Sequence, residues 1–254
     1  MRTIDIGGVS VVDTKLNLLE AKYNKLPLIL NFINAYSYYC FFNNPKYRKS
    51  VENAVNLPDG ISILWISYIY NRKVPFRITG TDAFMYYLQR AKTQNKKVLF
   101  IGSNRNTESL FQKRLDKEFI GLVYKYISPT YFASEMSENE NKMILDTIKG
   151  FKPNYIYVGL SAPKQEIWSY SNRNEFSEVE VILNVGAAFS FFAGTEKRAP
   201  LFFRKVGLEG VFRTLINPIK HFPKDIKSSW FIVSKIFSDI ILSKNKSRKK
   251  VNIK

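Results

Sequence analysis

The chain is poor in the residues that build metal centres and disulfide frameworks. Its 254 residues include one cysteine, Cys40, and one histidine, His221. A single cysteine excludes a disulfide framework, and a single histidine excludes a His-rich metal site. The two residues lie in unrelated segments, which disfavours a Cys–His nucleophile pair. We therefore expect Cys40 to be a small core residue.

Long apolar runs are also missing. No window reaches the roughly 18–20 uninterrupted apolar residues that a membrane-spanning helix needs. The nearest, Trp230–Leu242, is short and carries Lys235 and Asp239. The N-terminal sequence MRTIDIGG lacks the apolar segment of a secretory signal. We expect a cytoplasmic protein that can touch a membrane without crossing it.

Acidic residues are few relative to basic ones. Lys and Arg number 39 against 21 Asp and Glu, which gives a formal net charge of +18. Residues 196–254 hold 15 basic and 4 acidic side chains, so +11 of the net charge lies there. Such polarised charge favours a surface patch for polyanions, namely nucleic acid, nucleotide-activated substrates or an anionic membrane.

Apolar runs alternate with amphipathic segments through residues 1–195. The runs predict strands at Pro27–Ile33, Lys97–Ile101, Gly121–Tyr126, Tyr155–Gly159 and Val179–Val185. Helical periodicity between them predicts helices at Asp82–Gln94 (with Asp82 as N-cap), Thr107–Glu118, Ser137–Lys149 and Pro163–Arg173. This alternation is typical of an α/β domain with a doubly wound, mainly parallel, Rossmann-like sheet. Such sheets bind ligands at the carboxyl ends of their strands.

Residues 196–254 predict a basic helical appendage. Helices are expected at Leu201–Leu215 and Lys227–Leu242, separated by prolines, and Lys244–Lys254 is expected to be a disordered basic tail. The second helix places Val233, Ile236, Phe237, Ile240 and Ile241 on one face, opposite Ser234, Lys235, Ser238 and Asp239.

The apolar face of that helix has two interpretations. Taken alone, the helix slightly favours packing against the α/β domain or a second subunit. Next to the basic tail, interfacial binding to an anionic membrane is the better interpretation, because apolar insertion and charge attraction add together.

Two loops in the first half of the α/β domain contain chemically useful residues. The sequence Leu57-Pro58-Asp59-Gly60 consists largely of residue types that favour a β-turn. Such a turn could also direct the Asp59 carboxylate into a cleft, where it could act as a base. In Arg77–Asp82, a strand is expected to run into a glycine turn and a capped helix, whose start favours an anionic group, and Arg77 could add a forked donor to phosphate. A surface ion pair is the alternative interpretation of Arg77.

Two further loops follow later strands. After Gly159, Pro163 suits a first helical turn, and Lys164 opposes the helix dipole, which an anionic ligand would explain. After the last predicted strand, Gly186 allows close backbone approach, and Lys197 and Arg198 supply cations or form a solvated basic pair.

The order and spacing of these motifs resemble the TagA/WecG/CpsF family of glycosyltransferases. The resemblance covers roughly residues 1–225. It rests on Pro58-Asp59-Gly60, Arg77 with Gly80 and Asp82, Gly159 with Ala162-Pro163-Lys164-Gln165-Glu166, Gly186-Ala187-Ala188-Phe189, Gly194 with Lys197-Arg198-Ala199-Pro200, Gly207-Leu208-Glu209 and Arg213.

The resemblance implies inverting transfer of a sugar from a UDP donor to a polyprenyl-diphosphate-linked saccharide acceptor, in surface-polysaccharide synthesis. Asp59 becomes the candidate general base, and Arg77 and Gln165 join it as catalytic candidates. The implied substrate-binding residues are Asn34, Gly80, Asp82, Lys164, Glu166, Gly186, Lys197, Arg198, Arg213 and Lys220. No Asp-x-Asp metal motif is present, so arginine and lysine side chains are expected to replace a metal, and no cofactor is expected.

Some positions depart from the family pattern, notably Ser190, Gly210 and Lys220. They leave the donor open between an N-acetylmannosamine type, which leads, and another UDP-hexose or a uronic acid. The implied location is the cytoplasmic face of the plasma membrane, and a homo-oligomer stays open. A nucleic-acid-binding protein is a rival suggested by charge alone, and no known nucleic-acid motif is visible. A family member that binds without turnover is a third alternative.

Overall fold

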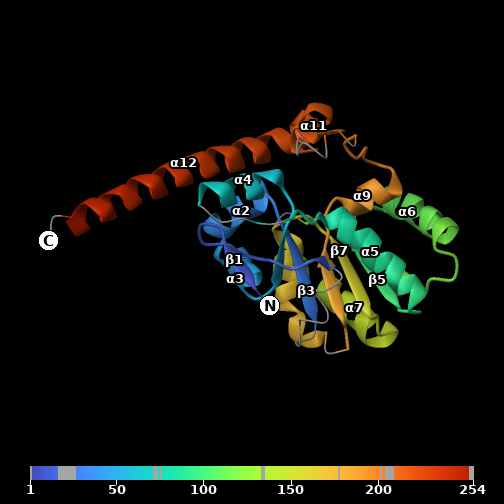
Figure 1. Cartoon of the computed structure of the whole chain (residues 1–254). Helices are drawn as coiled ribbons and strands as arrows, with labels where there is room; N and C mark the ends of the chain where they lie inside the picture. Colours follow the sequence, from blue (N-terminus) through green and yellow to red (C-terminus); the bar gives the residue numbers. More distant parts are fainter. Residues whose placement is uncertain are drawn as a thin grey trace.

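The computed structural model describes residues 2–16, 27–70, 74, 76–132, 135–176, 178–200, 202–203 and 209–251. Within the last range, only the backbone is described at 213, 220–221 and 242–251. Figure 1 shows a sheet covered by helices and a long C-terminal helix that reaches away from it.

Six strands form one sheet in the order β4-β3-β8-β7-β5-β6, and every neighbouring pair is parallel. The strands are β3 Leu28–Ile33, β4 Val55–Pro58, β5 Val98–Gly102, β6 Tyr124–Ile127, β7 Tyr155–Gly159 and β8 Val181–Asn184. A separate antiparallel pair consists of β1 Thr3–Asp5 and β2 Ser10–Val12. The predicted mainly parallel α/β sheet is confirmed.

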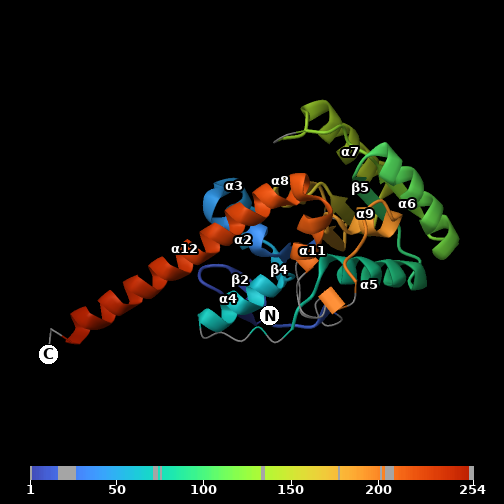
Figure 2. The ribbon, with the colours of Figure 1, turned by 90° about the horizontal axis from the view of Figure 1, so that it is seen from above.

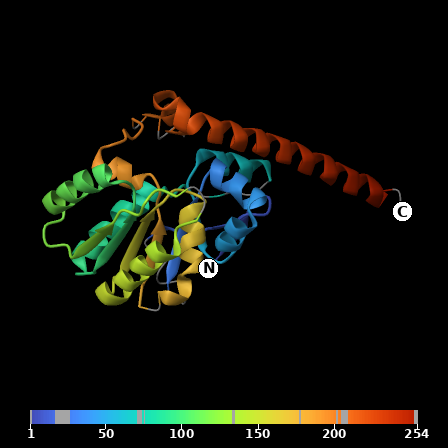
Figure 3. The same cartoon turned by 180° about the vertical axis from the view of Figure 1, so that it is seen from behind.

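Helices cover both faces of this sheet, as the front and back views show (Figures 1 and 3). Helices α5 Gly80–Thr93, α6 Arg105–Glu118 and α9 Ala188–Ala193 pack on one face. Helices α7 Glu138–Phe151 and α8 Lys164–Ser171 pack on the other, and α8 leads into the short 3-10 helix η2 Arg173–Glu175. The remaining helices are α2 Ala35–Asn43, α3 Pro45–Glu52, α4 Ile61–Ile69, α11 Glu209–Ile216 and α12 Pro218–Val251.

Strand β7 shows why these sequences form a doubly covered sheet. Its side chains alternate, so Tyr155 and Tyr157 join the core under α5 and α6, whereas Ile156 and Val158 join the core under α7. All four are fully buried. Because both faces are covered, the strand reads as a continuous apolar run, which is the pattern that predicted it.

Sequence periodicity located four of the helices but missed others. The predicted helix at Asp82–Gln94 is α5, and its N-cap is Thr79, whose side chain accepts from Asp82 N, rather than Asp82 itself. Strand β4 and helices α2 to α4 were not predicted. Strand β4 is four residues long and ends in Pro58, which an edge strand tolerates because its outer side needs no ladder hydrogen bond.

Two expectations for the appendage were wrong. Pro218 begins helix α12 and separates it from α11, as expected, but the helix continues through Pro223 to Val251, so Pro223 separates no elements. The segment from 244 to 251 is helical rather than disordered, because it contains no Gly or Pro and extends a helix that has already formed. The predicted helix at Leu201–Leu215 corresponds to α11 in its second half, whereas 201 and 204–208 lie outside the described residues.

One stripe of α12 packs against the α/β domain. Phe231 contacts Tyr39 and Phe42 of α2, with ring centroids 5.6 Å apart in both pairs. Ile232 and Ile236 pack on the same apolar cluster. Lys235 and Asp239, which were expected on the opposite face, lie on this stripe: the Lys235 ammonium is 4.5 Å from the Phe42 ring centroid. The packing interpretation of this helix is therefore confirmed, with a different set of residues.

A second stripe of α12 remains exposed, and we call it the outer stripe. It consists of apolar residues spaced three or four positions apart: Ile219, Phe222, Ile226, Trp230, Val233 and Phe237. Trp230 is 76% exposed and Phe237 is 65% exposed. Seen from above, α12 crosses the domain over α2 and continues past it (Figure 2). Among the described residues, no helix combines the length and apolar character needed to cross a bilayer.

Candidate active site

Asp59 lies where β3 and β4 end side by side. The Asp59 backbone N–H donates to Ile33 O at 2.9 Å, which fixes the turn that follows β4. Asn34 follows β3 and caps α2, because its Oδ1 accepts from Ser37 N at 3.1 Å. A Cβ atom at Gly60 would lie 3.2 Å from the Asn34 Cβ, so the two loops are in contact. Asp59 is half-buried at this end of the sheet, where the strands have their carboxyl ends, and we call it the carboxyl edge.

The loop containing Arg77 and Gly80 joins the same edge. Ile78 N donates to Pro58 O at 2.8 Å, which places this loop beside Asp59. Gly80 starts α5, and a Cβ atom there would lie 3.5 Å from both the Phe32 ring and Val185 O. The start of α5 thus contacts the ends of β3 and β8.

Glu209, the first residue of α11, pairs with two of the predicted arginines. It lies 3.7 Å from Arg77 Nη2 and 3.7 Å from Arg198 Nε. Arg198 also pairs with Asp82 at 3.2 Å. These contacts hold the appendage against the start of α5. Glu209 belongs to a sequence motif that indicates no role for it, because ion pairing between distant segments leaves no periodic signal.

The other predicted cations are spread more widely. Lys164 donates from Nζ to Phe132 O at 2.8 Å, and its burial and the nearby Lys224 ammonium lower its pKa. Lys197 is exposed. Arg213 belongs to α11 and Lys220 to α12, but both side chains lie outside the described part of the structure.

Gln165 and Glu166 lie beneath the edge rather than on its surface. Gln165 Nε2 donates to Asn184 O and to Glu166 Oε1, both at 2.9 Å. Gly186 lies beside the Gln165 carboxamide, since a Cβ atom at Gly186 would be 3.5 Å from Oε1. The Glu166 side chain is 2% exposed, and burial raises its pKa to about 7. Gln165 is itself 4% exposed, so neither side chain is open to solvent.

A row of buried amides underlies the same edge. Asn184 Nδ2 donates to Asn31 Oδ1 at 2.7 Å, and Asn31 Nδ2 donates to Asn56 Oδ1 at 3.2 Å. Ser169 of α8 donates to Asn184 Oδ1 at 2.8 Å. The row joins β4, β3 and β8 to α8, so it fixes the relative positions of the loops that carry Asp59 and Gln165. The sequence pattern gives none of these residues a role, because strand pairing alone brings them together.

Glu166 is expected to make the protein less stable as the pH rises. The unfolded carboxyl has a pKa of 4.5, and the folded one has a pKa of about 7. Between these values the unfolded chain loses its proton first, so the free energy of unfolding falls, by about 3 kcal/mol between pH 4 and pH 8. Glu166→Gln removes this titration, and urea unfolding at several pH values measures the difference from wild type.

The matched control is Glu178→Gln, which changes an exposed glutamate that lies 3.4 Å from Lys152. It should follow the wild-type pH dependence. A wild-type protein and Glu166→Gln variant with parallel pH profiles would contradict the assignment of the titration to Glu166.

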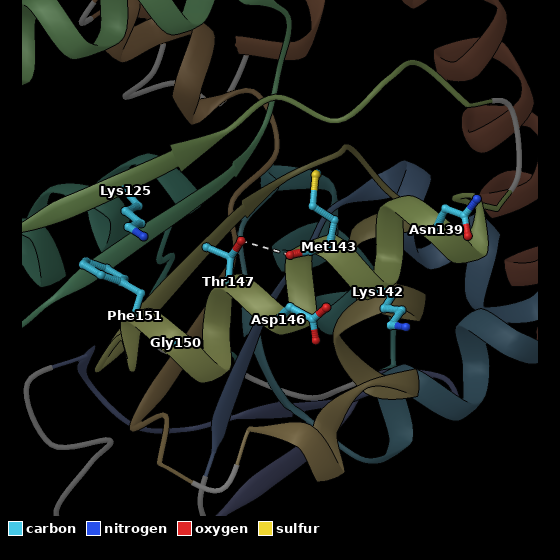
Figure 4. A pocket seen from close by; sticks show the side chains of 8 residues that line it. All are labelled: Lys125, Asn139, Lys142, Met143, Asp146, Thr147, Gly150 and Phe151. Carbon is cyan, nitrogen blue, oxygen red and sulfur yellow. Dashed lines mark hydrogen bonds between the residues drawn. The ribbon is translucent and has the colours of Figure 1, made fainter.

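Two hollows of the described surface lie apart from the loops that contain Asp59, Arg77, Gln165 and Gly186. One, of about 520 Å³, runs along α7 and is lined by residues including Lys142 and Asp146 of α7 and Lys125 of β6 (Figure 4). The other, of about 570 Å³, includes Tyr131 and Phe132 before α7. No three His, Cys, Asp or Glu residues of the described ranges are grouped as a metal site would require. We place the candidate site at the carboxyl ends of the strands, where the segments containing Asp59, Arg77, Gln165 and Gly186 meet.

The fold and this edge define a doubly wound α/β protein with carboxylate, carboxamide and cationic groups at the carboxyl ends of its strands, where such folds bind ligands. Comparison with known proteins then gives the family. The chain belongs to the glycosyl transferase WecG/TagA/CpsF family, whose model matches residues 4–246. The protein is therefore a glycosyltransferase.

Two relatives illustrate the similarity. The chain is 29% identical over 228 residues to an N-acetylglucosaminyldiphosphoundecaprenol N-acetyl-beta-D-mannosaminyltransferase of Bacillus spizizenii, with 87% of this chain and 86% of the relative covered. It is 30% identical over 159 residues to an enzyme of the same name from Staphylococcus aureus strain NCTC 8325, with 63% of this chain and 60% of the relative covered.

Proposed function

We propose that this enzyme transfers an N-acetylmannosamine-type sugar from a UDP donor to a saccharide linked to polyprenyl diphosphate, in the synthesis of a surface polysaccharide. The observation that carries the proposal is the convergence of Asp59, the Arg77 loop and Gln165 at one sheet edge in a member of this family. The names of the two relatives support both the sugar and the lipid-linked acceptor. Another UDP-hexose or a uronic acid is the alternative donor.

Asp59 supplies the base in this mechanism. Its carboxylate takes the proton from the acceptor hydroxyl while that oxygen attacks the anomeric carbon, and the bond from this carbon to the UDP oxygen breaks. A single displacement inverts the anomeric configuration and needs one base, since no covalent intermediate forms. The departing diphosphate gains negative charge, which Arg77, Arg198 and the basic residues Arg213 and Lys220 would stabilise in place of a metal.

The appendage indicates where in the cell the enzyme works. The outer stripe of α12 exposes apolar side chains along the helix, and basic residues follow at Lys244, Lys246 and 248–250. We assign this surface to the anionic cytoplasmic face of the plasma membrane, where a polyprenyl-linked acceptor is embedded. We divide the chain at residue 195 for the same reason. The α/β domain would carry the base, and residues 196–254 would complete the active site with cationic side chains and dock the enzyme on the membrane.

A transfer assay with a panel of UDP-sugars tests the proposal. With a lipid-linked N-acetylglucosaminyl diphosphate as acceptor, we expect turnover with the N-acetylmannosamine donor and an inverted product linkage. Turnover should persist in excess EDTA, because side chains carry the cationic role. Turnover with a different UDP-sugar alone would show that the donor is not of the N-acetylmannosamine type. Strict dependence on a divalent ion would contradict the metal-independent mechanism. No turnover with any donor would reject the proposed function.

A further inference from the structure

The neighbouring residues Gln165 and Glu166 form a buried pair whose hydrogen bonds are arranged asymmetrically. A carboxamide nitrogen has two N–H groups. In Gln165, one reaches the main-chain oxygen of Asn184 and the other reaches Glu166 Oε1, both at 2.9 Å. Both donors of Gln165 are therefore committed to fixed acceptors, and its oxygen is the atom left for another partner.

That oxygen lies where two loops of the candidate site meet. A Cβ atom at Gly186 would be 3.5 Å from Gln165 Oε1 and 4.0 Å from the Ser161 Cα. Gly186 follows β8 and Ser161 follows β7, so both belong to the carboxyl edge of the sheet. Among the described residues, Oε1 is buried and has no hydrogen-bond donor. A buried acceptor without a donor costs free energy, which a ligand O–H or N–H group would recover.

Glu166 accepts the second of the two hydrogen bonds that hold the Gln165 carboxamide. Asn184 O accepts one N–H, and a single hydrogen bond leaves the amide plane free to swing about it. The Glu166 carboxylate removes this freedom, and it is itself confined: 2% of its side chain is exposed, and α3 packs against α8 beside it. The titratable groups facing it are Tyr47 of α3 and Cys40 of α2. No ion pair to Glu166 occurs among the described residues.

We propose that Glu166 is a positioning residue for the transfer reaction, holding Gln165 so that Oε1 accepts a hydrogen bond from an O–H or N–H group of the sugar nucleotide. The inference rests on the proposed function and refines it. It changes the expected role of Glu166 from direct substrate binding to control of Gln165. It also predicts selectivity, because a sugar nucleotide without a donor group at this point leaves Oε1 unsatisfied.

Two substitutions of Glu166 separate positioning from structural support. Glu166→Gln keeps an oxygen that can accept from Gln165, so kcat/KM should stay within about threefold of wild type. Glu166→Met keeps the length of the side chain but removes the acceptor, and we expect kcat/KM to fall at least about tenfold. At pH 8 the Met variant should unfold at or above the wild-type temperature, because it no longer buries an ionisable carboxyl.

This combination of lost activity and retained stability is the result that a structural role would not give. Wild-type kcat/KM in Glu166→Met would overturn the proposal. So would a loss of activity that follows a loss of stability in both variants, because Glu166 would then support the fold alone.

A second measurement reports on Gln165 without turnover. The side-chain N–H signals of Gln165 in NMR spectra, identified by their absence in Gln165→Met, should exchange slowly with solvent in wild type and Glu166→Gln and faster in Glu166→Met. Slow exchange in Glu166→Met would show that Asn184 alone holds the amide and would overturn the proposal. If wild type transferred no sugar, the proposed function would fail, while this exchange measurement would still decide whether Glu166 holds Gln165.

Discussion

Replacing Asp59 by Asn is expected to lower the rate of sugar transfer about a thousandfold and leave sugar-nucleotide binding within about twofold of wild type. Asn has nearly the size of Asp, and the hydrogen bond that fixes the turn comes from the backbone of residue 59, which donates to Ile33 O at 2.9 Å. The substitution therefore keeps the geometry and removes the group that accepts the proton. Transfer is measured from product formation, and binding is measured by calorimetry with the UDP-sugar.

Asp116→Asn is the matched control for Asp59→Asn. Asp116 is an exposed aspartate of α6 that accepts a hydrogen bond from Tyr124 Oη at 2.7 Å, and it belongs to none of the loops at the candidate site. Its replacement should leave transfer unchanged. An Asp59→Asn enzyme with more than about a tenth of wild-type turnover would show that another group takes the proton.

The sequence was informative where burial on both faces produces a continuous apolar run. Strands β5 and β7 were predicted within one residue of their observed bounds, since residues 98–102 and 155–158 are buried and apolar or Gly. Strand β4 was missed because it has four residues, one of them Asn56, and ends in Pro58. Its neighbours α2 and α3 bury polar or amphipathic residues, Ser37 and Tyr38 in α2 and Tyr47 and Ser50 in α3, which blurs the 3.6-residue apolar period.

The site was foreseeable as a set of loops, but the relations among its residues were not. Motif order placed Asp59 and Gln165 in loops or helices that follow strands, where a parallel sheet gathers them. No strand directly precedes Arg77 among the described residues, and its loop reaches the site because Ile78 N donates to Pro58 O. The pairing of Glu209 with Arg77 and Arg198 joins segments more than a hundred residues apart in one case, and the buried amides of Asn31, Asn56 and Asn184 meet only after β4, β3 and β8 pair. The burial of Glu166 likewise depends on α3 covering α8.

The two stripes of α12 explain why one helix supported two interpretations. Residues 231, 232, 235 and 236 face α2, whereas 230, 233 and 237 face outward, so the apolar content exceeds what one contact surface requires. Packing on α2 accounts for the first stripe. An exposed apolar stripe next to a run of basic residues is the pattern of an interfacial helix, so the second stripe is where membrane binding can be tested without disturbing the first.

The triple variant Trp230→Ser, Val233→Ser, Phe237→Ser is expected to bind anionic vesicles about a hundredfold more weakly than wild type. Each side chain contributes about 1 kcal/mol when it inserts, and about 3 kcal/mol in total corresponds to roughly two decades in the partition coefficient. Cosedimentation with vesicles that contain anionic lipid measures this change. Transfer to a polyprenyl-linked acceptor in the same vesicles should fall in parallel, whereas transfer to a short, water-soluble acceptor should stay at the wild-type rate, because no residue of the sheet edge is altered.

Ile120→Ser with Met143→Ser is the matched control for the triple variant, because it removes apolar side chains that are 74% and 50% exposed outside the appendage. This control should bind vesicles as wild type does. Equal losses in the control and the triple variant would indicate nonspecific adhesion of exposed apolar groups. A triple variant that binds vesicles normally but no longer self-associates in sedimentation would assign the outer stripe to a contact between subunits.

Raising the salt concentration should weaken vesicle binding by the wild-type enzyme, since the basic residues at 244–250 act through screened attraction to anionic lipid. Binding that resists both the triple substitution and salt would place membrane contact on another surface of the enzyme.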